Sequence, residues 1–191
     1  MRIILSIFIF VLILSSCATQ QPTSDNKLGK TLNTLTIDNE VAKKEKEESI
    51  TGQIIYVPIY SYIYFNNKTS KINLAATLSI RNTDIVNPIT IYSIFYYDSA
   101  GKLIRNYITQ PFSLQPMAST EYVIEEDDVS GGIGANFLVE WYAKTNVSDP
   151  ILEAIMVSSR SGQGMSFISQ GRVIKKWSKE AKELTNNNEI K

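Results

Sequence analysis

The chain holds a single cysteine, Cys17, and its surroundings predict a covalent modification. Arg2 is followed by an apolar run, residues 3–14, that is typical of an export signal and too short to cross a membrane. Residues 14–16 (Leu-Ser-Ser) then precede the cysteine, as in a bacterial lipobox. We therefore expect cleavage after residue 16 and attachment of fatty acyl chains, such as palmitate, at Cys17. Two such chains anchor a protein stably in a lipid leaflet.

The alternative is a plain secretory signal in which the cysteine has no role. Acylation is favoured because the only cysteine of the chain lies where the apolar run ends. Ala18 and Thr19 follow it, so the aspartate that retains lipoproteins of enteric bacteria in the inner membrane is absent. We expect an exported envelope protein, anchored in a diderm organism to the outer membrane and facing the periplasm.

Four consecutive carboxylates, Glu125, Glu126, Asp127 and Asp128, form a candidate calcium site. Ca²⁺ takes about six to eight oxygen ligands, and the glycines of residues 131–134 would let backbone carbonyls turn inward. However, the spacing is not that of an EF-hand, and adjacent side chains at a strand end point to opposite faces. The alternative is a solvated acidic loop whose like charges discourage edge pairing. We expect no other metal site and no cofactor.

Tyrosines form a second candidate site. Exposed aromatic rings can stack on sugars or pack against a protein partner, because they bury much area at little entropic cost. On alternating strands they are also common as half-buried sheet residues with hydrated hydroxyls. The candidate binding face consists of Tyr60, Tyr62, Tyr64 and Tyr96.

Composition argues against enzymatic activity and against nucleic-acid binding. The sequence contains no histidine, which excludes Ser-His and Cys-His nucleophilic catalysis and histidine-ligated metals. With Cys17 committed to lipid, no disulfide can form within the chain. The 19 basic and 19 acidic residues balance, so no net field attracts nucleic acid. We expect a non-enzymatic protein with no catalytic residues.

The elements that position these residues begin at about residue 52, where period-two alternation and turn residues replace a polar segment. Residues 72–81 alternate apolar with polar, residues 89–97 are apolar on both faces, and residues 98–101 form a hairpin turn. About eight strands without intervening helices predict an all-β fold, an immunoglobulin-like antiparallel β-sandwich, with a barrel as the alternative.

The polar segment has few apolar residues and a charge cluster at residues 43–48, so it predicts a tether. At the other end, Val173, Trp177, Ala181 and Leu184 recur every three or four residues, which predicts a short amphipathic helix. That helix would pack on the domain or contact anionic lipid. The expected organisation is a signal peptide (1–16), a lipidated cysteine with its polar tether (17–51), a β-sandwich (52–172), and the helix with a disordered tail (173–191).

Four runs of residues resemble one bacterial family. They are 54–61 (IIYVPIYS), 76–84 (ATLSIRNTD), 96–103 (YYDSAGKL) and 130–141 (SGGIGANFLVEW). Together they look like the family called domain of unknown function 3124, many of whose members look like lipoproteins. The resemblance covers residues 52–174. It implies an envelope protein without a known activity, and it transfers no functional residues.

These features lead to two functional hypotheses. The first is a membrane-anchored, non-enzymatic envelope lipoprotein whose domain binds another envelope protein or stabilises an assembly. The alternative is a ligand-binding module for glycan or calcium that uses the tyrosines or the acidic loop.

Overall fold

The computed structural model describes residues 40–159 and 164–179. Within these ranges residues 40–48 are helical, and no helix is long and apolar enough to cross a membrane. The same residues form twelve strands: β1 (Thr51–Pro58), β2 (Tyr62–Phe65), β3 (Asn67–Asn73), β4 (Ala75–Arg81), β5 (Ile89–Tyr97), β6 (Leu103–Asn106), β7 (Phe112–Leu114), β8 (Ser119–Ile124), β9 (Asn136–Ala143), β10 (Ile151–Ser158), β11 (Met165–Gln170) and β12 (Arg172–Ser178).

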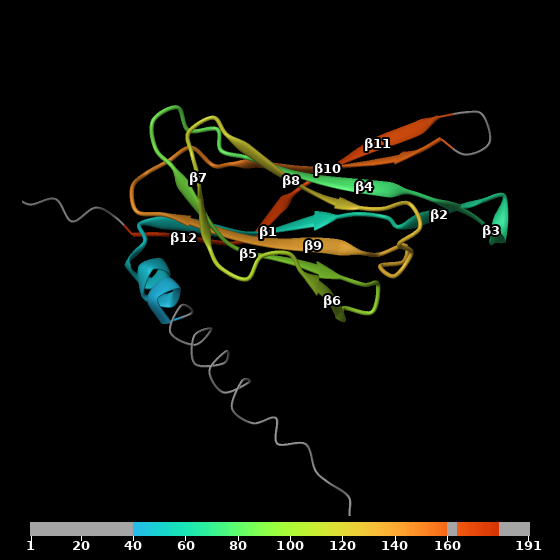
Figure 1. Cartoon of the computed structure of the whole chain (residues 1–191), viewed down its shortest axis with the longest axis horizontal. Helices are drawn as coiled ribbons and strands as arrows, with labels where there is room; N and C mark the ends of the chain where they lie inside the picture. The colour runs from blue at the N-terminus through green and yellow to red at the C-terminus, as the bar shows by residue number, and fades with distance from the viewer. Residues whose placement is uncertain (1–39, 160–163, 180–191) are drawn as a thin grey trace, which may run out of the picture. The chain divides into compact units, whose positions relative to one another are not determined.

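The strands form two large antiparallel sheets that lie in two layers (Figure 1). One sheet has the order β12-β1-β9-β5-β6, with β7 also paired to β5, and the other has the order β11-β10-β4-β8. β2 and β3 form a separate two-stranded sheet. The predicted all-β, antiparallel class is confirmed.

The core lies between the two large sheets and follows from strand periodicity. On β4 the side chains of Ala76, Leu78 and Ile80 are fully buried, while the residues between them are half-buried. Val139 and Trp141 on β9 face them from the other sheet and belong to the same hydrophobic cluster. The Trp141 indole N–H donates to the side-chain oxygen of Gln53 at 3.2 Å, so its one polar atom is satisfied. Trp141 is therefore a fully buried core residue.

The predicted C-terminal helix is wrong over residues 173–178, because β12 pairs along β1 as an edge strand. Gly171 lets the chain cross from β11 in one sheet to β12 in the other. A Cβ there would lie 2.7 Å from Ile55 Cγ2 and 3.0 Å from the Leu152 carbonyl oxygen. The helical spacing of the apolar residues was compatible with either structure, and backbone pairing with β1 decided the outcome. Residues 180–191 lie outside the described residues.

The predicted tether is too long, since residues 40–50 belong to the folded domain. Glu45 accepts hydrogen bonds from the Tyr142 hydroxyl at 3.2 Å and from the Lys144 ammonium at 2.8 Å. Lys46 pairs with Glu140 on β9. These contacts are made by polar and charged groups, which is why hydropathy did not reveal them. Residues 17–39, the rest of the predicted tether, lie outside the described residues.

We expect Gly52→Ala to lower the free energy of unfolding by about 1–3 kcal/mol, the usual cost of overpacking. The Trp177 indole lies against Gly52, and an added Cβ would also come within 2.6 Å of the Trp141 carbonyl oxygen. The matched control is Gly164→Ala, because, chain neighbours aside, no heavy atom of the described residues lies within 4 Å of a Cβ placed there. Urea denaturation of the two variants measures the difference. Equal midpoints would contradict the packing of Trp177 on Gly52.

Candidate functional site

The β2–β3 hairpin is attached to the domain through one of its faces. Ile63 and Ile72 are opposite each other in its register, and both pack against the core. Just beyond the hairpin, Leu74 is fully buried, and its N–H donates to the Ser61 carbonyl at 3.0 Å. Because side chains alternate along a strand, Tyr62 and Tyr64 lie on the opposite face.

On that face three side chains form an aromatic and cationic group. The rings of Tyr62 and Tyr64 meet edge to face, with centroids 5.7 Å apart. The Lys71 ammonium lies 3.9 Å from the centre of the Tyr62 ring and 5.8 Å from that of Tyr64. Its hydrogen bond to the Tyr62 hydroxyl lowers the pKa of that phenol. Tyr64 is 45% exposed, so this surface is accessible to a partner. Phe65, at the end of β2, is 55% exposed.

Tyr60 stands apart from this group. Its ring makes an edge contact with Phe167 of β11, with centroids 6.5 Å apart, and remains partly exposed. Sequence reasoning missed Phe65 and Lys71. The available signal was strand pairing, because Lys71 lies directly opposite Tyr64 in the hairpin register.

Tyr96 is not part of the predicted binding face, because its side chain is completely buried. A bulge in β5 between Ile91 and Ser93 reverses the alternation, so that Ile94 and Tyr96 face inward in place of Phe95. The hydroxyl of Tyr96 lies 3.0 Å from that of Ser61, and burial raises the pKa of the phenol. Tyr96 is therefore part of the hydrophobic core.

The four carboxylates after β8 do not converge on one point. Glu126 accepts a hydrogen bond from the Ser158 hydroxyl at 3.4 Å, and Asp128 pairs with the Arg105 guanidinium at 3.0 Å. Partial burial opposes the charge of Asp128, but hydrogen bonds from Ser130 and the nearby Arg105 outweigh burial and lower its pKa. In the described part of the chain, no group of three or more acidic, histidine or cysteine side chains could hold a metal ion.

A hollow of about 220 Å³ is lined by three of these carboxylates, those of Glu125, Asp127 and Asp128, together with Arg105 and Val123. The Arg105 guanidinium already pairs with Asp128, which makes this hollow a poor site for a divalent cation.

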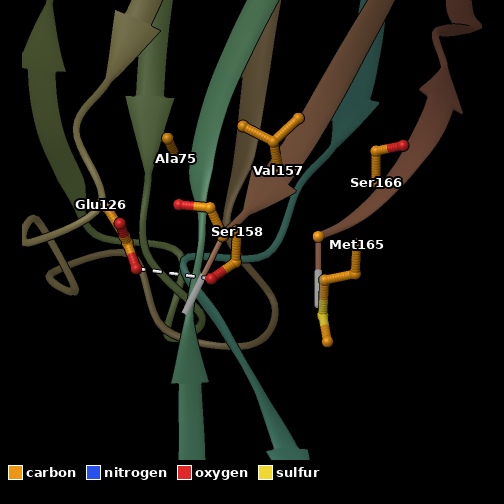
Figure 2. A pocket seen from close by; sticks show the side chains of 8 residues that line it. Ala75, Glu126, Val157, Ser158, Met165 and Ser166 are labelled. Carbon is orange, nitrogen blue, oxygen red and sulfur yellow. Dashed lines mark hydrogen bonds between the residues drawn. The ribbon is translucent and has the colours of Figure 1, made fainter. Parts of the chain in front are cut away.

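A pocket of about 300 Å³ opens beside Glu126, where β10 ends and β11 begins. Figure 2 shows the Glu126 carboxylate bonded to the Ser158 hydroxyl, with Val157 and Met165 on the neighbouring strands. The described lining residues offer one carboxylate and several hydroxyls, without the second carboxylate that a hydrolytic pair needs. The described lining of this pocket can donate and accept hydrogen bonds.

Residues 52–174 match the model of a family described as "Protein of unknown function (DUF3124)". The chain belongs to this family. The matched range runs from the start of β1 into β12, so it includes the hairpin and the acidic loop. No curated protein matches the chain.

The chain is also similar to a solved structure titled "Crystal Structure of Thermotoga maritima 1070". The two chains are 12% identical, with a TM-score of 0.41. The match covers 63% of this chain and 92% of the other. Cys17, the predicted acylation site, lies outside the described residues.

We expect millimolar calcium to leave the melting temperature of the protein unchanged. A ligand that binds the folded state raises its stability, but Arg105 already pairs with Asp128, and Glu126 accepts a hydrogen bond from Ser158. Thermal melts with and without calcium, with magnesium as the control ion, provide the measurement. A rise specific to calcium that disappears in Asp127→Asn would restore the calcium site.

Proposed function

We propose that the protein is a non-enzymatic lipoprotein of the cell envelope, anchored through acylated Cys17, whose β-domain binds another protein. The observation that carries the binding role is the β2–β3 hairpin. It pairs with neither large sheet, yet it leaves Tyr64 and Phe65 partly exposed and holds Lys71 beside the Tyr64 ring.

The position of the hairpin supports this role. The chain enters the described domain through the helix at residues 40–48, and β1 then runs from that end toward the hairpin (Figure 1). β1 has eight residues, which span about 26 Å in a strand. The hairpin therefore lies at the end of the domain farther from the point of chain entry, which is the side of the chain that leads to Cys17.

The chemistry of the hairpin favours a protein over a sugar as partner. Sugars stack on open ring faces, whereas here Lys71 covers the face of Tyr62 and the two tyrosines meet edge to face. Partly exposed aromatic residues beside a cation match the composition of protein–protein hot spots. A partner with apolar and acidic groups would complement Phe65 and Lys71.

We also propose that the two layers form a variant immunoglobulin-like sandwich. In that fold, strands B and E pair in one sheet and strands C and F pair in the other. The pairs β4–β8 and β5–β9 correspond to these. The outer strands differ, because β1 lies beside β9, where the last strand of the fold belongs, and β10 lies beside β4, where the first belongs.

A photoreactive residue at position 64 should crosslink to a specific protein in intact cells, whereas one at position 123 should not. Val123 is a matched control because it is similarly exposed but lies on β8. Lys71→Glu should abolish the crosslink by reversing the charge that faces the partner. The substitution is on the surface, so we expect a stability change within about 0.5 kcal/mol. Equal crosslinking at both positions would contradict a hairpin-specific partner.

Cells fed an alkyne-tagged palmitate should label the wild-type protein and not Cys17→Ser. We also expect only the wild-type protein to remain with membranes after a salt wash, because a protein that carries two acyl chains resists extraction. Mass spectrometry of the mature N-terminus gives an independent measurement. Recovery of an uncut chain with a free thiol at Cys17 would refute the anchor.

A further inference from the structure

Three side chains form what we call the apolar tip: Ile85, Val86 and Met117. They are exposed to 79%, 71% and 68%, the highest values among the large apolar side chains described. Ile85 and Val86 lie between β4 and β5, and Met117 lies between β7 and β8. The two loops touch, since the Met117 N–H donates to the Asp84 carbonyl at 3.1 Å. Exposed apolar groups that are grouped in this way commonly mark an interaction site.

Hydrogen bonds hold the loop of Ile85 and Val86 in place. One carboxylate oxygen of Asp84 accepts from the N–H groups of Val86 at 2.9 Å and Asn87 at 2.7 Å, and the other accepts from Ser148 N–H at 3.0 Å. These donors, with Asn87 first, lower the pKa of Asp84 and keep it ionised. The apolar side chains are therefore presented by a defined turn.

The buried side chain of Asn82 joins this turn to the second loop. Its amide nitrogen donates to the carbonyl oxygens of Asn87, Leu114 and Gln115, at 3.0, 3.1 and 3.1 Å. Because one amide connects both loops, Met117 is held beside Ile85 and Val86. The backbone hydrogen bonds keep these three apolar side chains exposed to solvent, although burial of each would be more favourable.

The apolar tip lies at the end of the domain where the chain enters. Its first loop follows β4 and leads into β5, where Thr90 pairs with Tyr142, and the Tyr142 hydroxyl donates to Glu45 of the helix at residues 40–48. Nearby cations are already paired: Lys144 with Glu45, and Lys176 with Asp149. A surface that contacts this end would therefore meet aliphatic groups without an excess of positive charge.

We propose that the apolar tip inserts into the lipid leaflet that holds the acylated Cys17. The inference rests on the proposed anchor, because the anchor brings this end of the domain to a membrane. Residues 17–39 span at most about 80 Å. A tether of this length keeps the tip at a high effective concentration near the lipid, so weak insertion is sufficient. Aliphatic side chains whose neighbouring cations are already paired suit the headgroup–acyl boundary and need no anionic lipid.

The test uses the acylated full chain reconstituted in phosphatidylcholine vesicles, with or without phosphatidylglycerol. Acylation consumes the only native thiol, so Val86→Cys carries a single environment-sensitive fluorophore. Thr69→Cys, on the exposed hairpin, is the matched control. We expect several-fold stronger quenching by spin-labelled lipid at position 86 than at position 69, equal in both vesicle types. A label placed at Met117→Cys should also be quenched by spin-labelled lipid, and adding Ile85→Asp should remove that quenching.

The outcomes separate the inference from the anchor. An acylated chain that fails to enter vesicles refutes anchoring through Cys17 and with it the proposed function. A chain that is anchored, but whose label at position 86 is quenched by lipid no more than at position 69, overturns the apolar tip alone. Shielding of position 86 from iodide without quenching by lipid would indicate a protein contact and would also overturn it. Unchanged melting temperatures of the labelled variants ensure that folded protein is compared.

Discussion

The pairing of β1 on both of its edges determines how the rest of the molecule is arranged. β1 lies between β9 and β12, and its inward residues Ile55 and Val57 enter the core. Its first residues bring the helix at residues 40–48 to one end of the sheets, and its last residues lead to the hairpin at the other. The separation between the point of chain entry and the proposed binding surface is therefore set by one strand.

The start of β1 is held by charge and aromatic contacts as well as by apolar packing. The Lys46 ammonium pairs with Glu140 and lies 4.7 Å from the centre of the Tyr92 ring and 5.8 Å from that of Trp177. The Trp177 indole N–H in turn donates to the Ser49 hydroxyl at 3.1 Å. Glu140 is mostly buried, so the loss of Lys46 would leave a charge without its partner, which is costly. This group joins the helix, β9 and β12.

The two ends of the domain have different chemistry, and the difference gives the proposed functions a consistent geometry. The chain-entry end has an aliphatic tip among paired charges, which suits a lipid surface. At the hairpin end the Lys71 ammonium lies over the Tyr62 ring. This combination of aromatic rings and a cation suits a protein surface. A domain docked through the first end would present the second to the surrounding compartment.

The sequence alone was sufficient for features that depend on local backbone geometry. The alternation on β4 predicted which residues are buried, and the turn at residues 98–101 has its glycine at a φ of 79°, which favours Gly101. Period and turn chemistry are properties of a few neighbouring residues, so the all-β class followed from them.

Only the tertiary structure decided which way a strand faces and what its ends contact. The bulge in β5 turned Tyr96 into the core, pairing with β1 made a strand of residues 172–178, and Arg105 became the partner of Asp128. The apolar tip likewise joins loops that are about 30 residues apart in sequence. Each outcome depends on long-range pairing, because a one-residue shift in register exchanges the buried and exposed faces of a strand.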